Sequence, residues 1–553
     1  MKRRTFLRGL GGVGAGAVLL NAGCNPSREG AVGGRPTVRT KSWESLGYPS
    51  PFTYTAGPGY WRMTYVFDTL LWKDATGKQL PWLASSYTPS PDGLVHTLNL
   101  RGVKWDDGRP LTAGDVVFTY EYYTSRTFTP LLVGLPRPGI HVRPVGDKTV
   151  EFRLDKPDAT FEQFVLGTMP IVPQHIWSKI DDPMGTFDKR VLISTGAYEL
   201  KSHDDNLGTE LYVAKDNYFM GRPFVRRIEG IDPAKDDELA TLRAGACDAG
   251  GGPAEGTRND QLAPFVDDPS YGILRQPAGF AFPLFFNMKK GGALADLRFR
   301  RACAHAINRQ DLVERLLTGN GTVGSQGWLP PSNSYHEPDV RDYPFDLAEA
   351  NRLFDEAGYR RTGDGHRTDP DGSPMRYTLH FASVVPRPLI DLVAESLRTV
   401  GIDIDLQVVD LVALFGLKLQ DNFDLLVTNY PGPSGTGPNG DPDMLRGVYY
   451  SKPPNPFHKA TGYADPDVDR LIDAQLSTYN VEDRKRIVSQ IQKKVAEDVP
   501  VVMLYYTDFI WVFKRSVFDQ WYYTPGGIGT GLPNIYNKHA FITGYKEGLK
   551  MRA

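Results

Sequence analysis

The sequence predicts an α/β protein that folds into two or more lobes. Its 553 residues exceed the length that a single hydrophobic core usually serves, so the chain should divide. Runs with a hydrophobic period of two, which is typical of strands, are interspersed with runs that carry an apolar helical face. Hydrophobic residues make up 41% of the chain, which is ample for such cores.

The first 23 residues have the features of an export signal and are not expected in the fold. Arg3 and Arg4 precede a Phe-Leu pair, and the glycine-rich, mildly apolar segment that follows is too short for a confident membrane span. Residues 24–35 are polar and rich in Gly and Pro, as flexible tethers are. We therefore predict a signal over 1–23 and a tether over 24–35.

Two motifs at this end resemble known export signatures. The twin arginines resemble the twin-arginine export motif, although Lys2 stands where Ser or Thr is usual. Cys24 follows "LLNAG" and resembles the acylated cysteine of a lipobox, although Asn21 stands where Leu is expected. We predict twin-arginine export and lipidation of Cys24. The alternative is ordinary cleavage, which would leave Cys24 as an unmodified thiol.

Charge and cysteine content exclude other classes of protein. The formal net charge is −2, and the signal carries four basic residues and no acid, so the mature chain is more acidic still. Such a chain is a poor candidate for binding nucleic acid. Cys247 and Cys303 lie in apolar surroundings, and two cysteines make no disulfide framework, so we expect two buried thiols.

A strand, a turn and a capped helix are predicted around residues 94–123. Leu94, His96, Leu98 and Leu100 alternate as on a strand, and Asp106-Asp107-Gly108 is a turn sequence. Thr112 and Asp115 have the spacing of a capping box before the apolar run "VVFTYEYY". The three acids could instead hold a metal or share a proton. Since they lack calcium-loop spacing, we assign them to the scaffold.

Later segments show the same two hydrophobic patterns, the alternation of a strand and the apolar face of a helix. Residues 150–154 alternate as a strand, and 297–317 present two apolar helical faces. A helix should begin after Asp346 and stop at Gly358, and residues 500–513 have the composition of a buried strand. Residues 65–72 are interpreted as helix, and 50–61 as a loop.

Several of these segments resemble one known family. The segments are "DDGRPLTAGDVVFTYEYY" (106–123), "STGAYELKSH" (194–203) and "DLRFRRACAHAINRQDLVERLLTGNG" (296–321). They are similar to segments of the extracytoplasmic solute-binding proteins of ABC importers, in the peptide/nickel class. The resemblance extends in order over nearly all of the mature chain.

The resemblance implies a two-lobed periplasmic-binding-protein-like α/β fold with a ligand cleft between the lobes. Lobe I would be discontinuous, over 36–280 plus 507–553, and lobe II would span 281–506. It further implies a monomer without cofactors that binds a peptide or other small solute and delivers it by hinge closure to membrane permease subunits. The lipid anchor would hold it on the outer face of the cytoplasmic membrane or in the periplasm.

Enzymatic motifs are missing from the sequence. It contains no G-x-S-x-G, H-E-x-x-H, C-x-x-C or P-loop motif, so we predict no catalytic residues and no metal site. A secreted hydrolase with an unrecognised site remains an alternative. A sensor or a chaperone on the same fold is another, because fold alone does not fix function.

Candidate ligand-binding residues come from loop-like segments. Thr55, Ala56 and Gly57 match a segment that peptide binders of the family present to the ligand backbone, and aromatic residues flank them. The long loop 429–445 is the second candidate, because long loops in compact domains are often functional. The full set of candidates is Tyr54, Thr55, Ala56, Gly57, Tyr60, Trp328, Arg387, Tyr430, Thr436 and Asn439.

One position in that loop predicts the type of ligand. "TGPNGDPD" (436–443) is similar to a segment of dipeptide receptors whose first acid pairs with the peptide's ammonium, but Pro438 occupies that position here. Proline carries no charge, and a buried ammonium without a counter-charge is strongly disfavoured. The sequence therefore predicts poor binding of free dipeptides. It favours a longer peptide or an oligosaccharide stacked on Tyr54, Tyr60 or Trp328.

Overall fold

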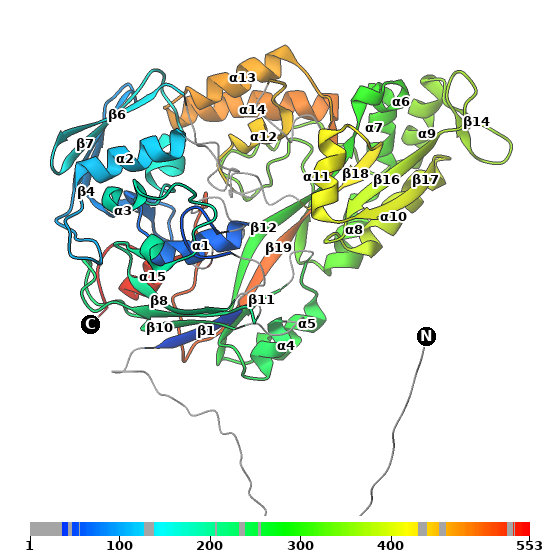
Figure 1. Ribbon diagram of the computed structural model, residues 1–553. Helices are drawn as coiled ribbons and strands as arrows, with labels where there is room; N and C mark the ends of the chain where they lie inside the picture. Colours follow the sequence, from blue (N-terminus) through cyan, green and yellow to red (C-terminus); the bar gives the residue numbers. More distant parts are fainter. Residues whose placement is uncertain are drawn as a thin grey trace, which may run out of the picture.

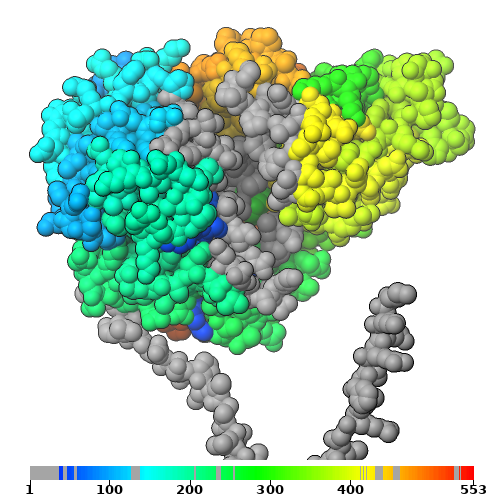
Figure 2. Space-filling view, viewed as in Figure 1, coloured from blue at the N-terminus to red at the C-terminus, as the bar shows by residue number. Residues whose placement is uncertain are grey.

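The computed structural model shows two bodies joined by two long strands (Figure 1). It describes residues 36–41, 47–54, 56–125, 138–204, 207–231, 238–252, 256–429, 440–452, 461–527, 535 and 537–552. The predicted signal, the tether and Cys24 lie outside these ranges. Figure 2 shows the same two bodies as separate masses, with the segment around residues 440–500 across the top between them.

The first body contains two four-stranded sheets. One has the order β1 (Thr37–Lys41), β10 (Arg227–Ile231), β9 (Thr209–Ala214) and β8 (Tyr198–Asp204). The other has the order β4 (Ala84–Pro89), β5 (Val95–Leu100), β7 (Thr149–Leu154) and β6 (Ile140–Gly146). A short pair, β2 (Leu71–Lys73) and β3 (Gln79–Pro81), lies apart from both sheets.

Helices cover these sheets. The named helices of the first body are α1 (Ala56–Val66), α2 (Ala113–Thr124), the π-helix η2 (Glu162–Leu166), α3 (Gln174–Trp177), the 3₁₀ helix η3 (Lys189–Leu192) and the C-terminal α15 (Lys538–Thr543). α4 (Glu238–Arg243) and α5 (Asn259–Val266) lie below, beside β11 and β12 (Figure 1).

One long sheet runs through both bodies. Its order is β11 (Ala249–Gly251), β19 (Val501–Lys514), β12 (Tyr271–Phe286), β18 (Leu425–Val427), β16 (Arg376–Ala382) and β17 (Asp403–Val409), and β13 (Gly321–Val323) pairs with β19. β12 and β19 are antiparallel over almost their whole length. Their register is interrupted between Gln276 and Phe280, about midway.

The second body surrounds the β16–β18 end of that sheet with helices. They are η4 (Met288–Lys290), α6 (Gly292–Ala295), α7 (Leu297–Ala306), α8 (Arg309–Leu317), α9 (Leu347–Glu356), α10 (Arg387–Thr399) and α11 (Leu411–Leu419). The hairpin of β14 (Arg360–Arg361) and β15 (Arg367–Thr368) follows α9. α12 (Met444–Tyr449), α13 (Pro466–Leu476) and α14 (Val481–Asp498) extend towards the first body (Figure 1).

Strongly periodic segments form the predicted elements. The alternating runs form β5 and β7, the two apolar faces of 297–317 form α7 and α8, and the buried run forms β19. Asp346 caps α9 by accepting from the Glu349 amide, at 2.9 Å. Cys247 and Cys303 are buried free thiols, as predicted, and burial raises the pKa of Cys247 to about 12.

The start of the first body differs from the prediction. α1 begins at Ala56, inside the segment interpreted as a loop, and ends at Val66, where a helix was predicted to begin. Pro58 falls in the first turn of α1, where a proline removes no intrahelical hydrogen bond. The Gly and Pro residues therefore mark the beginning of a helix here, and the apolar run after it supplies β2.

A buried ion pair fastens the C-terminus to the first body. The Nζ of Lys538 lies 2.6 Å from the Oδ1 of Asp68, and both side chains are fully buried. Asp68 also accepts hydrogen bonds from the Trp82 indole (2.9 Å) and the Thr195 hydroxyl (3.1 Å). The ammonium of Lys538 further lies 4.5 Å from the ring centroid of Trp72. The last helix is thus part of the core built by residues near the N-terminus.

Candidate functional site

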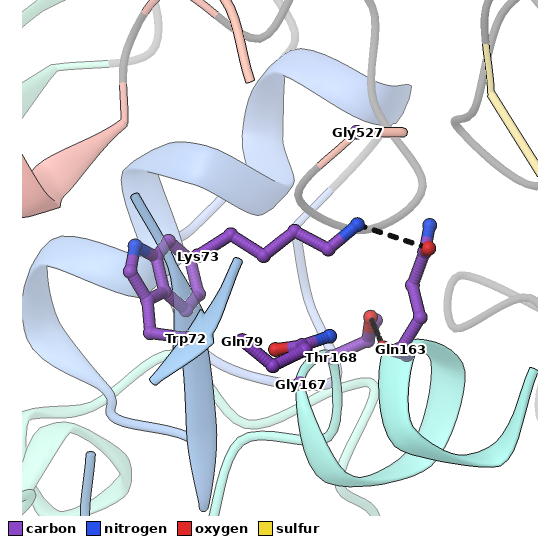
Figure 3. A pocket seen from close by; sticks show the side chains of 7 residues that line it. All are labelled: Trp72, Lys73, Gln79, Gln163, Gly167, Thr168 and Gly527. Carbon is purple, nitrogen blue, oxygen red and sulfur yellow. Dashed lines mark hydrogen bonds between the residues drawn. The ribbon is translucent and has the colours of Figure 1, made fainter. Parts of the chain in front are cut away.

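A small pocket opens in the wall of the first body. It has room for about one water molecule and is lined by Trp72, Lys73, Gln79, Gln163, Gly167, Thr168 and Gly527 (Figure 3). These residues come from the β2–β3 pair, from η2 and the turn after it, and from the segment that follows β19. Segments far apart in the sequence therefore meet at one point of the first body.

Lys73 is the charged group of this pocket. It ends β2, and only 8% of its surface is exposed. Its Nζ donates to the Oε1 of Gln163 at 3.0 Å (Figure 3). It also donates to the carbonyl of Gly526 at 3.4 Å. Both acceptors are neutral. Burial lowers the pKa of Lys73 to about 8, and the negative charge of Asp441 opposes that shift.

Asp441 belongs to the segment before α12. Its two oxygens accept from the guanidinium of Arg484, at 2.6 and 2.9 Å, and the two side chains are 11% and 5% exposed. Oδ1 also accepts from the Asp443 amide at 2.8 Å. The carboxylate is thus held by Arg484 and the turn before α12, and it is not available as a free counter-charge.

One buried polar atom of the pocket is unsatisfied among the described residues. The Oε1 of Gln79 is buried and has no hydrogen-bond partner among the described residues. Its other amide atom faces Gly167, where a Cβ would lie 3.2 Å from the Nε2 of Gln79. A glycine at 167 therefore leaves room for this side chain. A buried amide oxygen without a donor is costly, which makes it a candidate contact for a ligand.

The aromatic candidates at the start of α1 lie beside this pocket. Tyr60 donates its hydroxyl to the carbonyl of Thr168, at 2.7 Å, and Thr168 lines the pocket. Tyr54 packs edge-on against Tyr60, and each ring is 1% exposed. Neither ring presents a free face for stacking in this arrangement. Ala56 and Gly57 stand in the first turn of α1, whereas Thr55 lies outside the described residues.

The remaining candidates are not gathered at the pocket. Trp328 is buried against Phe285 and Tyr449, so its ring is part of the packing of the second body in this arrangement. Arg387 starts α10, pairs with Asp391 at 2.7 Å, and lines a separate open groove. The other candidates, Tyr430, Thr436 and Asn439, lie outside the described residues, as does Pro438.

The two bodies touch above the pocket. The hydroxyl of Tyr479, between α13 and α14, donates to the Oε1 of Glu162 at 2.6 Å. Tyr87 donates to the same oxygen from within the first body, at 2.8 Å. The Ala159 amide donates to the Leu476 carbonyl at 2.8 Å. Glu162 directly precedes Gln163 on η2, so the contact between the bodies and the pocket share one short helix.

The acids of the predicted turn have structural partners. Asp106 accepts from the Nζ of Lys215 at 2.6 Å and from the Ser194 amide at 3.1 Å. Asp115 completes the predicted capping box with Thr112 and also accepts from the Gln174 amide, at 2.9 Å. Within the described ranges, His, Cys, Asp and Glu side chains form no group of three or more that could hold a metal ion.

Sequence reasoning missed the residues that line the pocket. Lys73 carries a signal, because it stands in the apolar strand run "TLLWKD", where a lysine is exceptional. Gln79 and Gln163 carry none, since an amide side chain at a strand end or on a helix is ordinary. Their convergence depends on the approach of η2 to the β2–β3 pair, which periodicity does not reveal.

Comparison with known proteins identifies the family. The family model described as bacterial extracellular solute-binding proteins, family 5 Middle, matches residues 78–455. The oligopeptide-binding protein AppA of Bacillus subtilis is 26% identical over 436 residues, which cover 77% of each chain. The haem-binding protein A of Haemophilus influenzae is 25% identical over 453 residues, 76% of this chain and 77% of its own.

Solved structures show the same architecture. NikA from Brucella suis, in complex with Fe(III)-EDTA, superposes with a TM-score of 0.74 at 22% identity, over 91% of this chain and 99% of its own. The two-lobed fold with mixed helices and sheets is thereby confirmed. Among the described residues, every helix is too short or too polar to span a bilayer. Since the family model covers more than half of the chain, the protein belongs to the bacterial extracellular solute-binding proteins of family 5.

Proposed function

We propose that this protein captures a solute outside the cytoplasmic membrane and delivers it to the permease subunits of an ABC importer. Membership of an extracellular solute-binding family supports this function. The observation that carries it is the division of the described chain into two bodies joined by the long strands β12 and β19, together with the family match. A site between two bodies is the arrangement in which closure can follow from ligand binding.

The proposed lobes are 36–280 plus 507–553 and 281–506, with the hinge on β12 and β19. The register of the two strands breaks between Gln276 and Phe280. Ala278, inside the break, has φ of 52°, an uncommon conformation for a residue with a side chain. Its amide donates to Asp508 at 3.2 Å. An irregularity on both crossing strands is a suitable place for the backbone to bend.

The proposed ligand is an oligopeptide longer than a dipeptide, with an oligosaccharide as the second candidate. An oligopeptide-binding protein is among the relatives, and AppA of B. subtilis was solved with a nonapeptide. Asp441 is the acid nearest to Pro438 along the matched motif, and it is engaged by Arg484. An acid already paired in this way is a poor partner for a peptide ammonium.

Two segments are proposed to contact the ligand. Residues 54–60 adjoin the pocket through the bond from Tyr60 to Thr168, and residues 430–439 directly precede Asp441. Neither Arg387 nor Trp328 is among the described residues that line this pocket.

Calorimetry tests the ligand class. Protein that has been unfolded, freed of any bound solute and refolded should bind tetra- to nonapeptides and bind free dipeptides poorly. Mass spectrometry of the solute released from native protein should identify the same class. Micromolar binding of simple dipeptides that is lost on acetylation of their amine would instead show that an amine site exists and that our interpretation of Pro438 is wrong.

We also propose a cellular location and an oligomeric state for the mature protein. We place the mature protein on the outer face of the cytoplasmic membrane or in the periplasm, as a lipid-anchored monomer without a catalytic role. Support comes from the twin arginines, from Cys24 and from the extracellular family. Hydrolysis of the bound solute during the mass-spectrometric assay would favour the enzymatic alternative.

A further inference from the structure

Four hydrogen-bond contacts form a chain from the core of the first body to the second body. The carbonyl of Gly93 lies 3.0 Å from the Nε2 of His96, and the Nδ1 of His96 lies 2.7 Å from the hydroxyl of Tyr87. That hydroxyl lies 2.8 Å from the Oε1 of Glu162, and the hydroxyl of Tyr479 lies 2.6 Å from the same oxygen. Because Tyr479 belongs to the second body, the chain crosses the contact between the bodies.

This chain is one proton short when its groups have their ordinary charges. A neutral imidazole carries one proton, each tyrosine hydroxyl carries one, and an ionised carboxylate carries none. Three protons cannot serve four contacts, so two lone pairs would face each other at one of them. Burial raises the pKa of Tyr87 and of Tyr479, so neither hydroxyl gives up its proton. A fourth proton is needed to satisfy every contact.

His96 is the group best placed to take this proton. Tyr479 and Tyr87 both donate to Glu162, which favours the ionised carboxylate. Tyr87 then has no proton left for His96, so Nδ1 must donate to the Tyr87 oxygen and Nε2 to the Gly93 carbonyl. Only the imidazolium donates from both nitrogens. The ring is fully buried, so solvent does not replace these partners.

The groups around His96 act on its protonation in both directions. Burial lowers the pKa of His96, whereas the bond to the Gly93 carbonyl and the charges of Glu162, Asp158 and Asp92 oppose that shift. All of these charged neighbours are acids, so each of them favours the imidazolium. Since burial is the larger effect, the imidazolium forms on the acid side of the ordinary histidine value of about 6.5.

Contact with the second body fixes the chain in this arrangement. The ring of Tyr479 lies over Gly93, where a Cβ would be 3.1 Å from the Cδ2 of Tyr479. Glu162 is half-buried. Once the bodies separate, its carboxylate can turn to water and leave the Tyr87 proton to a neutral His96. The arrangement in which the bodies touch therefore binds the fourth proton more tightly than the open one.

We propose that His96 is a proton switch for closure: its protonated form completes the chain to Tyr479 and favours the form in which the two bodies touch. This inference rests on the proposed solute-binding function and adds its regulation by pH. The sign follows from linkage, because the closed form binds the proton more tightly than the open form. Solute affinity should rise on acidification below about pH 6.5 and level off once the open form is protonated too.

The test measures solute affinity and proton uptake on refolded, solute-free protein. The probe is a pool of N-acetylated hexapeptides without Asp, Glu, His or Cys, whose charge stays constant between about pH 5 and pH 8. We expect calorimetry to show about 3- to 10-fold tighter binding at about pH 5.5 than at about pH 7.5. Buffers of different ionisation enthalpy should reveal the uptake of up to one proton per complex.

Three variants assign the effect. H96Q removes the titrating ring and should abolish both the pH dependence and the proton uptake. Y479F keeps His96 but releases Glu162, so it should abolish them as well, and it serves if H96Q does not fold. H141Q is the matched control, because His141 is an exposed histidine of the same body, paired with Asp155 at 3.2 Å. It should keep the wild-type pH dependence. Circular dichroism at each pH establishes that the variants are folded.

Two further measurements read the switch directly. In ¹⁵N NMR of histidine-labelled protein, the ring of His96, identified by its absence from H96Q, should become protonated at a higher pH in the complex than in the free protein. Small-angle scattering needs no probe. The radius of gyration of solute-free protein should fall on acidification in the wild type and in H141Q, and stay constant in H96Q and Y479F.

Several results would overturn the inference. Equal affinity at both pH values, or a pH dependence that H96Q or Y479F retains, would refute the switch while solute binding stands. Proton uptake with a neutral His96 ring in the complex would place the proton on Glu162 instead. If the hexapeptides bind at no pH, the proposed peptide ligand fails, and scattering decides the switch by itself. Compaction that is lost in H96Q then supports it, and an unchanged radius in the wild type contradicts it.

Discussion

Asp115 shows how one carboxylate can organise a stretch of fold without taking part in chemistry. Its Oδ2 accepts from the Thr112 amide (2.8 Å) and hydroxyl (3.0 Å), and its Oδ1 accepts from the Gln174 amide at 2.9 Å. The side chain therefore joins the start of α2 to the start of α3. Asp106 has an ion pair with Lys215, but it is 36% exposed, so solvent weakens the contribution.

The corresponding substitutions should change stability and not binding. Asp115→Asn should lower the free energy of unfolding by about 1–2 kcal/mol, because a cap and a buried charge-assisted bond are lost. Asp106→Asn should lower the free energy of unfolding by less, within about 1 kcal/mol. Chemical denaturation measures both, and calorimetry with a bound peptide measures affinity. A large loss of affinity at unchanged stability would assign these acids to the ligand site instead.

At the scale of single residues, the sequence predicts an interaction best when the two interacting residues lie close together in the chain. The Thr112–Asp115 box was predictable, because both residues lie within one turn of the chain. The burial of Lys73 was not, because its partners are Gln163 and Gly526, far away in sequence. Its strand position alone does not tell whether a lysine is covered or extends into solvent.

Among the elements, the connection between α13 and α14 has the clearest mechanical role. Tyr479 of this connection and Tyr87 of β4 both donate to Glu162, and the bond from Tyr479 joins the two bodies. Glu162 lies on the π-helix η2, and such helices are frequent at functional sites. Because Gln163 is the next residue, closure of the bodies and occupancy of the pocket should influence one another.

Removing this bond should favour the open form. Tyr479→Phe should speed solute release and lower affinity several-fold, because the bond stabilises only the state in which the bodies touch. Tyr122→Phe is the control, since it removes a hydroxyl bond within the first body, to the Ile180 carbonyl at 3.0 Å, and should leave release unchanged. Stopped-flow fluorescence and small-angle scattering measure the two effects. Equal behaviour of the two variants would contradict a role for Tyr479 in closure.

Elements were predictable where hydrophobic periodicity was strong, as in β5, β7, α7 and β19. The start of α1 was mistaken because Gly57, Pro58 and Gly59 suggest a loop, although a proline is acceptable in a first turn. The division of the first body into two sheets was not predicted either. Strand pairing joins residues far apart in sequence, such as Thr37 of β1 and Arg227 of β10.

For the molecule as a whole, the testable question is how it reaches its location. Replacing Arg3 and Arg4 together by lysine should leave the protein in the cytoplasm if export uses the twin-arginine route. Cys24→Ser should release the mature protein from membranes. Cell fractionation and immunoblotting measure both. Normal export of the double-lysine variant, or continued membrane attachment of the serine variant, would disprove the respective assignment.

The Asp68–Lys538 pair has a consequence for the order in which the chain matures on the ribosome. Asp68 is synthesised early, but its counter-ion arrives 470 residues later, when nearly the whole polypeptide exists. Until then a carboxylate destined for a dry core lacks its counter-ion, so the first body cannot finish folding as it emerges. The second body lies between the two residues in sequence and can fold sooner. The N-terminal part of this protein is therefore among the first to be made and the last to be completed.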